Sequence, residues 1–354
     1  MKVQILIPHY KETHEEVEPL LDSLAVQQSI DFSEVGVVIA YDGPEATELC
    51  REPKYNPAIS ADMGDLTLPV WAMKYPFEIE HVRIPEHVGV SACRNAALDA
   101  ATADYVMFCD ADDMFCDVCG LHVIFREIEN GGFDTLVSCF REESRDPNDK
   151  SKVVYINHDM DSTFVHGKVH RREYLIENKI RFNDKLTIHE DSYFNILAQN
   201  LAEEEKAKYC PMPFYLWKWR DNSVCRHDPD YILKTYNNML DSNDALVDEF
   251  VRRMREDKAN FYVGFMVMDA YYTMNKPEWI DKTHSDYRDA VEKRFAVYYE
   301  KHKSQFESLS NQERMQISIG VRTRAATEGM LMEAITLDQW LDKIEKGGDS
   351  NAAS

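Results

Sequence analysis

The sequence contains no long apolar run, and its cysteines form no regular pattern. No stretch approaches the roughly 20 apolar residues that a membrane-spanning helix needs. The apolar stretch between Met1 and Pro8 is too short for a signal peptide and is typical of a strand that enters a turn. The eight cysteines lack the spacing of a disulfide framework or a zinc site. A cytoplasmic protein is therefore expected.

Positive charge is also scarce. Lys and Arg together number 40 against 63 Asp and Glu, which gives a formal net charge of −23. Such a surface on average repels the phosphates of nucleic acids, which proteins bind through Lys and Arg. A nucleic-acid partner is therefore disfavoured. It would require a local basic groove, for which the candidates are Lys168, Arg171, Arg172 and Arg181.

The chain's 354 residues suit one catalytic domain of about 200–250 residues and a smaller second unit. Up to about residue 230, apolar runs alternate with amphipathic stretches, which is typical of an α/β domain with parallel strands. Beyond that point the apolar residues recur at helical spacing. We therefore expect an α/β domain at 1–230, a mostly α-helical region at 231–346 and a disordered tail at 347–354.

The individual elements follow from periodicity and capping signals. Apolar runs predict strands at 3–7, 35–40, 79–84, 104–109, 134–140 and 152–156. Helical spacing predicts helices that begin near Thr13, Ser91 and Leu121, and further helices after residue 230. The Pro-rich stretch 50–76 shows no period and is expected to be a surface insertion.

Carboxylates come directly after two of these strands. Asp42 follows the strand at 35–40, and Asp110-Ala111-Asp112-Asp113 follows the strand at 104–109. In an open α/β sheet, ligands bind at the carboxyl ends of the strands. Three carboxylates within four residues repel one another unless a cation lies among them, and Mg²⁺ or Mn²⁺ prefers such oxygen ligands. For the cluster taken alone, a solvated acidic turn is the alternative explanation.

Six segments between residues 1 and 227 form an ordered set, although no single one of them is specific. They are ILIPHYKE at 5–12, Asp42, His87-x-Gly89-x-x-x-x-Arg94-Asn95, the cluster from Asp110 to Asp113, HGKVHRREYLIENKIRFND at 166–184 followed by His189-Glu190-Asp191-x-x-Phe194, and WKWRDNSVCRH at 217–227. Their order resembles that of the family 2 glycosyltransferases of the GT-A fold, which are mostly inverting enzymes. His87 and Cys93 depart from the family pattern, which usually has Asn and Ala there.

The resemblance implies a Rossmann-like mixed sheet flanked by helices, with a site for a nucleotide-sugar donor. UDP is the favoured nucleotide. The residues expected to contact the donor are Pro8, Tyr10, Glu12, Asp42, His87, Arg94, Asp110, Ala111 and Arg220. A Mn²⁺ or Mg²⁺ ion is expected on Asp110 and Asp112, with His227 as a further ligand. Asp113 is expected to face the donor sugar or to support the ligands of the ion.

On the acceptor side, the resemblance implies that Asp191 removes the proton of the acceptor hydroxyl and that Glu190 binds acceptor hydroxyls or holds a neighbouring side chain. An acidic helix start, where carboxylates favour the helix dipole, is the alternative explanation of this pair. The expected acceptor is a glycan, a cell-envelope component or another hydroxyl compound. The helical region is expected to dock on the catalytic domain or to form a homo-oligomer rather than to catalyse.

Three other functions stay open from the sequence. A sugar-phosphate nucleotidyltransferase normally opens with a Gly-rich loop carrying an Arg, where this chain has Pro8-His9-Tyr10-Lys11. A glycosyltransferase that acts on a hydroxylated DNA base would need the basic groove described above. A non-catalytic domain that binds a sugar nucleotide is disfavoured by the intact acidic cluster and by Glu190-Asp191.

Overall fold

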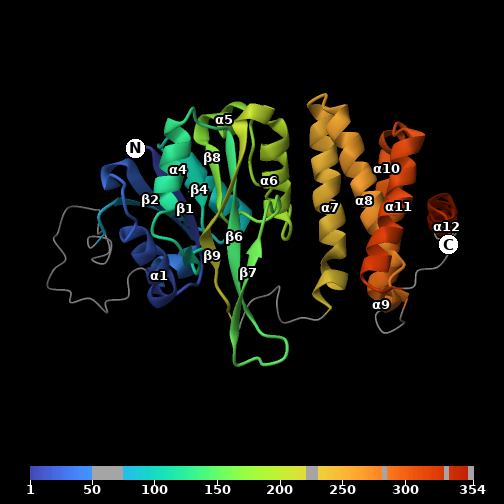
Figure 1. Cartoon of the computed structure of the whole chain (residues 1–354), viewed down its shortest axis with the longest axis horizontal. Helices are drawn as coiled ribbons and strands as arrows, with labels where there is room; N and C mark the ends of the chain where they lie inside the picture. The colour runs from blue at the N-terminus through green and yellow to red at the C-terminus, as the bar shows by residue number, and fades with distance from the viewer. Residues whose placement is uncertain (50–74, 221–229, 281–284, 331–334, 350–354) are drawn as a thin grey trace. The chain divides into compact units, whose positions relative to one another are not determined.

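The computed structural model describes residues 1–49, 75–220, 230–280, 285–330 and 335–349. The chain divides into two compact units, Met1–Ser223 and Val224–Ser354. Figure 1 traces the first as an α/β unit and the second as a set of helices. The division lies near the expected boundary at residue 230, and the roles assigned to the two parts stay predictions.

One mixed sheet forms the first unit. Its described strands are β1 Val3–His9, β2 Val35–Asp42, β3 Glu78–Ile84, β4 Tyr105–Phe108, β5 Met114–Phe115, β6 Thr135–Arg145, β7 Val153–His158, β8 Lys168–Arg171 and β9 Ala207–Trp217. Their order is β3-β2-β1-β4-β8-β6-β9-β5, and β7 pairs with β6. Strands β1 to β4 are parallel, whereas β8 is antiparallel to both β4 and β6. The expected α/β class with a mixed sheet is confirmed.

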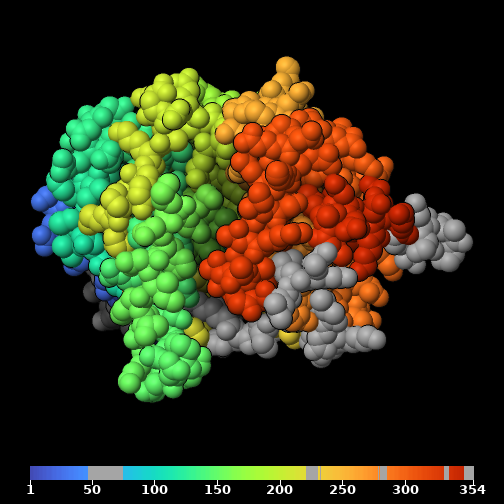
Figure 2. Space-filling model, turned by 45° about the vertical axis from the view of Figure 1, so that its right-hand side comes forward, coloured from blue at the N-terminus to red at the C-terminus, as the bar shows by residue number. Residues whose placement is uncertain are grey.

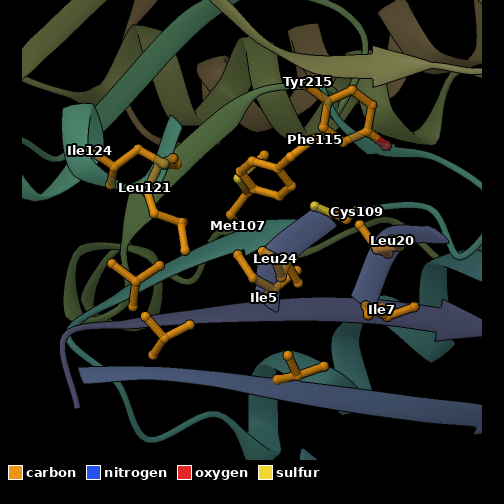
Figure 3. Packing of buried hydrophobic residues seen from close by; sticks show 14 of the residues in the cluster. Ile5, Ile7, Leu20, Leu24, Met107, Cys109, Phe115, Leu121, Ile124 and Tyr215 are labelled. Atoms are coloured by element: carbon orange, nitrogen blue, oxygen red, sulfur yellow. The ribbon is translucent and has the colours of Figure 1, made fainter. Parts of the chain in front are cut away.

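Alternation along the strands sends side chains to opposite faces of this sheet. On β1, Ile5 and Ile7 belong to a buried cluster with residues of two helices, α1 His14–Ala25 and α4 Gly120–Glu129. Figure 3 shows these isoleucines among the side chains of that cluster. On the opposite face of β4, the Phe108 ring meets the Phe194 ring edge-on, with the centroids 5.6 Å apart. Phe194 belongs to α6 Glu190–Leu201. The sheet is therefore covered by helices on both faces.

Helix starts in this unit follow the expected signals. Thr13 and Glu16 form a capping box at the start of α1, and the Thr13 N–H lies 2.7 Å from Glu16 Oε2. The other described α-helices besides α1, α4 and α6 are α2 Pro44–Leu49, α3 Val90–Ala100 and α5 Arg172–Glu177. Strands β6 and β7 continue beyond the sheet as a projecting antiparallel hairpin, which Figure 2 shows in green.

The second unit is helical in its described residues. Its helices are α7 Tyr231–Arg252, α8 Glu256–Met274, α9 Pro277–Ile280, α10 Ser285–Glu307, α11 Asn311–Thr327 and α12 Leu337–Asp349. Large aromatic side chains such as Phe250, Tyr272 and Phe295 are fully buried in it. Helix α12 continues to Asp349, past residue 347 where the tail was expected to begin, and 350–354 lie outside the described residues. Self-association through this region stays a prediction.

Across the described ranges, no helix is both long enough and apolar enough to cross a membrane.

Candidate active site

A cavity of about 290 Å³ opens at the carboxyl ends of β1, β2 and β4. In the parallel register His9 lies opposite Tyr41, and Leu6 lies opposite Phe108, so the residues that follow these strands emerge at one edge of the sheet. The cavity is lined by Pro8, His9, Tyr10, Glu12, Asp42, His87, Val90, Cys93, Arg94, Asp110, Ala111 and Asp112. The structure therefore brings together every donor-contact residue expected from the sequence except Arg220.

Asp42 organises one end of this cavity. Its carboxylate accepts hydrogen bonds from the N–H groups of Val88 at 2.7 Å and Gly89 at 2.9 Å, and lies 2.9 Å from His87 Nδ1. Gly89 has a φ of 86°, a left-handed conformation that favours glycine. The His87 ring stacks on Tyr10 with the ring centroids 4.2 Å apart. One buried carboxylate thus holds an aromatic pair at the edge of the cavity.

The acidic cluster meets two guanidinium groups. Arg94 Nη2 donates to Asp110 Oδ1 at 2.8 Å, and Arg220 Nη1 donates to Asp112 Oδ2 at 2.6 Å. Burial opposes ionisation of Asp110, but Arg94 outweighs it and lowers the pKa of this carboxyl below its usual value. Burial, together with the charge of Asp110, raises the pKa of Asp112. Arg220 thus contacts the cluster from outside the cavity lining.

Asp113 does not line the cavity. Its side chain is buried, with the Tyr215 hydroxyl donating to Oδ2 at 2.6 Å and the Lys218 N–H donating to Oδ1 at 2.9 Å. Burial and the neighbouring charges of Asp112 and Asp110 raise the pKa of Asp113 well above its usual value. The carboxyl is therefore not part of the cavity lining, and of its two expected roles, facing the donor sugar or supporting the ligands of the ion, both stay predictions.

Glu190 and Asp191 open α6 and connect to the cavity through Arg94. The buried Arg94 guanidinium donates from Nη1 to Glu190 Oε1 at 2.9 Å, while its other end holds Asp110. Burial, and then the charge of Glu190, raise the pKa of Asp191 to about 7, against the opposing effect of Arg94. His189, just before the pair, has a left-handed φ of 64°. The structure therefore links Glu190 to the acidic cluster through one side chain, and Asp191 follows Glu190 in the chain.

The donor atoms around the cluster suit a divalent cation. Ligand atoms of Asp110, Asp113 and His166 all lie within 4.8 Å of one another. His166 is buried, and its Nδ1 has no hydrogen-bond partner among the described residues. Burial lowers the pKa of His166 to about 3, so its ring is neutral, which is the form that binds metal ions. The expected ligand His227 lies outside the described residues, as do residues 50–74 of the expected insertion.

Sequence reasoning considered Lys168 only for a basic groove and gave no individual role to the histidines on either side of it. His166, Lys168 and His170 alternate along the chain, and all three are buried. Burial lowers the pKa of Lys168 to about 8; its Nζ donates to the Phe164 carbonyl and lies 3.7 Å from Asp161. Alternation of polar residues at every second position was an available signal that they share one face of an extended segment.

Comparison with known proteins adds the following. Residues 65–197 match the model of a family described as glycosyl transferase family 2. The crystal structure of S. aureus TarS 1-349 in complex with UDP is similar at a TM-score of 0.61 and 14% identity, covering 100% of this chain and 92% of that one. The complex of TarS 1-349 with UDP-GlcNAc is similar at 0.56 and 17%, covering 94% and 93%. No protein with a curated description matches the sequence. The structural likeness establishes the GT-A type of α/β fold.

Proposed function

Because residues 65–197 match the model of glycosyl transferase family 2, we propose that this chain is a member of that family and that it transfers a sugar from a UDP-sugar to an acceptor hydroxyl, with inversion and metal assistance. Transfer from a nucleotide-sugar donor is the activity of such a family. The observation that carries the finer proposal is the cavity at the ends of β1, β2 and β4. Its lining coincides with the donor-contact residues that the family motifs single out.

At the nucleoside end, the stacked rings of Tyr10 and His87 offer an aromatic face for a base, and Asp42 lies beside them. His87 can hydrogen-bond the edge of a uracil. The TarS structures that hold UDP and UDP-GlcNAc support uridine as the nucleoside. We therefore assign this end of the cavity to the nucleoside, with the diphosphate toward Asp110.

At the diphosphate end, Asp110 and the neighbouring carboxylates would hold a divalent cation. When bound, such a cation supplies positive charge beside the departing diphosphate. Arg220 adds a guanidinium near Asp112, and guanidinium groups suit phosphate oxygens. Asp110 has a lowered pKa, so this carboxylate is already ionised for the role.

On the acceptor side, we assign the general base to Asp191. Inversion in a single displacement needs one base that removes the hydroxyl proton as the oxygen attacks. A pKa of about 7 suits a carboxylate that accepts a proton near neutral pH. Glu190 is held by Arg94, so its carboxylate is positioned to orient an acceptor hydroxyl beside the base. In this proposal the two acidic residues at the start of α6 act in the reaction, Asp191 as the base and Glu190 as the residue that orients the acceptor.

Transfer to a hydroxylated DNA base is disfavoured by the residues that would have formed its basic groove. Lys168 is buried, Arg171 Nε lies 2.8 Å from Asp134 Oδ1, and the Arg181 guanidinium pairs with Asp99. Three of the four candidate cations of the groove are therefore paired within the protein itself. A glycan, a cell-envelope component or another hydroxyl compound fits the acidic protein better as an acceptor.

Thermal unfolding with a panel of nucleotide sugars, with and without Mn²⁺, tests the donor assignment because a ligand stabilises the state that it binds. We expect UDP-sugars with Mn²⁺ to raise Tm more than GDP-, CDP- or dTDP-sugars. A clear preference for another base would contradict the uridine assignment. Hydrolysis of the bound donor separates an enzyme from a binding domain, and NMR of the product's anomeric centre tests inversion.

A further inference from the structure

The ring of His166 is held rigidly beside the acidic cluster. It stacks on Tyr215 with the centroids 4.9 Å apart and on Phe164 with the centroids 5.4 Å apart, and Phe140 meets it edge-on at 5.0 Å. Aromatic contacts on several sides leave the imidazole little freedom to turn. The same Tyr215 donates its hydroxyl to Asp113, so ring and carboxyl share one support. Such support is what fixes the direction of a metal-binding histidine.

The nitrogen that this packing directs toward the carboxyls has no hydrogen-bond partner among the described residues. His166 is 3% exposed, and Nδ1 lies 3.8 Å from Asp113 Oδ2. A buried polar atom without a partner destabilises the folded state, so a compensating interaction is expected at this nitrogen. The nearby groups are carboxyl oxygens, and with Asp110 they place three ligand atoms within 4.8 Å of one another.

We propose that His166, through Nδ1, is the nitrogen ligand of the divalent cation, with Asp110 and Asp113 supplying oxygen ligands on the interior side of the cluster. The proposal rests on the metal assistance proposed above and assigns the nitrogen to a residue other than His227. An imidazole within the ligand set favours a transition ion such as Mn²⁺ over Mg²⁺, which prefers oxygen alone.

Asp112 has a different part in this arrangement. Its carboxylate is paired with Arg220, and it is not a member of the group of close ligand atoms. Among the described residues, the carboxyls around the cluster outnumber the cations. The carboxyls are those of Asp110, Asp112, Asp113, Glu190 and Asp191, and the cations are Arg94, Arg220 and Lys168. A divalent cation between Asp110 and Asp113 would offset this excess of carboxyls beside the neutral ring of His166. Asp112 then keeps Arg220 in place next to the donor.

The full-length protein loaded with Mn²⁺ alone provides the test, since no donor or turnover is needed. Electron spin-echo envelope modulation detects a ¹⁴N nucleus bound to Mn²⁺. The variant His166→Phe keeps an aromatic ring in the stack and removes the nitrogen. His158→Phe is the matched control, because His158 also stacks on Phe140, with the centroids 4.5 Å apart, but lies outside the ligand group and pairs with Glu142.

We expect a ¹⁴N coupling in the wild type and in His158→Phe and His227→Phe, and its loss in His166→Phe. The Kd for Mn²⁺ should rise more than the roughly 10–100-fold that loss of a supporting residue causes. A coupling that persists in His166→Phe, one that vanishes in His227→Phe instead, or a wild-type spectrum without ¹⁴N coupling would each overturn the proposal. Loss of the coupling in His227→Phe, and a wild-type spectrum without ¹⁴N coupling, can each be measured even if His166→Phe does not fold. Failure of UDP-sugars to bind would refute the donor assignment without altering this spectrum.

Discussion

Among the described residues, two clusters each combine two aspartates and a histidine, and one of the two suits a cation. In the α/β unit the members are Asp110, Asp113 and His166; in the helical unit they are Asp244, Asp248 and His302. The Asp244 carboxylate forms hydrogen bonds with Arg294 at 2.8 Å, with Lys301 at 2.6 Å and with His302 at 2.6 Å. The protein thus supplies its own cations to the helical cluster.

The pKa values of the carboxyls in the two clusters are shifted in opposite directions, as Asp244 and Asp113 show. Burial opposes ionisation of Asp244, yet hydrogen bonds from His302, Lys301 and Arg294 lower its pKa below the usual value. Burial and neighbouring carboxylates raise the pKa of Asp113 well above its usual value. Residue types alone do not distinguish a metal site from an ion-pair network. What distinguishes them is the state of the histidine: His302 Nε2 hydrogen-bonds Asp244, whereas His166 Nδ1 has no hydrogen-bond partner among the described residues.

The largest expected effect separates the two clusters directly. Asp110→Asn should remove Mn²⁺-dependent binding of UDP and reduce kcat by at least about 10²–10³-fold, the range found when one stabilising group for a developing charge is lost. Asp244→Asn should leave UDP binding unchanged. It should instead lower the free energy of unfolding by roughly 1–3 kcal/mol, because Arg294 and Lys301 lose a charged partner. Calorimetry with UDP and Mn²⁺, and urea unfolding, measure the two effects.

The comparison would fail if the two substitutions had the same result. Loss of UDP binding in Asp244→Asn would give the helical cluster a role in the donor site, and unchanged kcat in Asp110→Asn would remove the α/β cluster from catalysis.

The next largest effect concerns the base. Asp191→Asn should reduce kcat by about 10²–10⁴-fold with donor affinity nearly intact, because a general base acts in the chemical step. Glu190→Gln should act in part through the acceptor KM. Steady-state kinetics with donor and acceptor varied separately distinguish the two. An essential Glu190 and a tolerant Asp191 would exchange their roles, and normal rates in both variants would contradict the proposed mechanism.

The contributions of Asp191 in the α/β unit and Asp244 in the helical unit to stability should depend on pH with opposite signs. Asp191 must be ionised to accept a proton, so kcat should rise with pH through about 7. Its raised pKa means that it contributes stability fully below the pKa of the unfolded chain, and that this contribution is lost as pH rises to about 7. Asp244 has a lowered pKa, so its contribution is present above the unfolded pKa and is lost as pH falls.

Urea unfolding between pH 5 and pH 8 checks these signs. Asp191→Asn should be more stable relative to the wild type at pH 8 than at pH 5, by a few kcal/mol at most, since one pKa unit corresponds to about 1.4 kcal/mol. A wild type and a variant with identical pH dependence would show that Asp191 does not titrate as its burial suggests.

The smallest effect belongs to the exposed member of the helical cluster. Asp248 pairs with Lys301 at 2.6 Å, but its side chain is 55% exposed. Exposed ion pairs typically contribute about 0–1 kcal/mol, so Asp248→Asn should change the free energy of unfolding by less than about 1 kcal/mol. Binding of UDP and Mn²⁺ should not change. A decrease of several kcal/mol in the free energy of unfolding would mean that solvent does not screen the pair of Asp248 and Lys301.

Local signals in the sequence predicted much of the fold and one end of the site. The apolar runs of β1, β2 and β4 and the carboxylates after them are contiguous, and parallel strands place such residues at one edge. Strands β5 and β8 and most of β9 were not predicted. β5 has two residues, and β8 carries Lys168 and His170, whose polar character is typical of the surface although the fold buries them.

Side-chain partners could not be predicted, because they depend on segments distant in the chain. Arg94 was expected to contact the donor, but nothing in the sequence indicates that it bridges Asp110 and Glu190. Asp113 differs from Asp112 only in position, yet the turn sends its carboxyl to Tyr215. His166 needed both its stacking partners and the direction of Asp113 before its role could be proposed.

Calorimetric titration of UDP into the wild-type protein, with Mn²⁺ and again with EDTA, tests the central claim most directly. We predict binding with Mn²⁺ that weakens at least about tenfold in EDTA, equal to about 1.4 kcal/mol, because the cation and the diphosphate share the carboxyl end of β4. Equal affinity in EDTA, or no binding of UDP under either condition, would contradict the account.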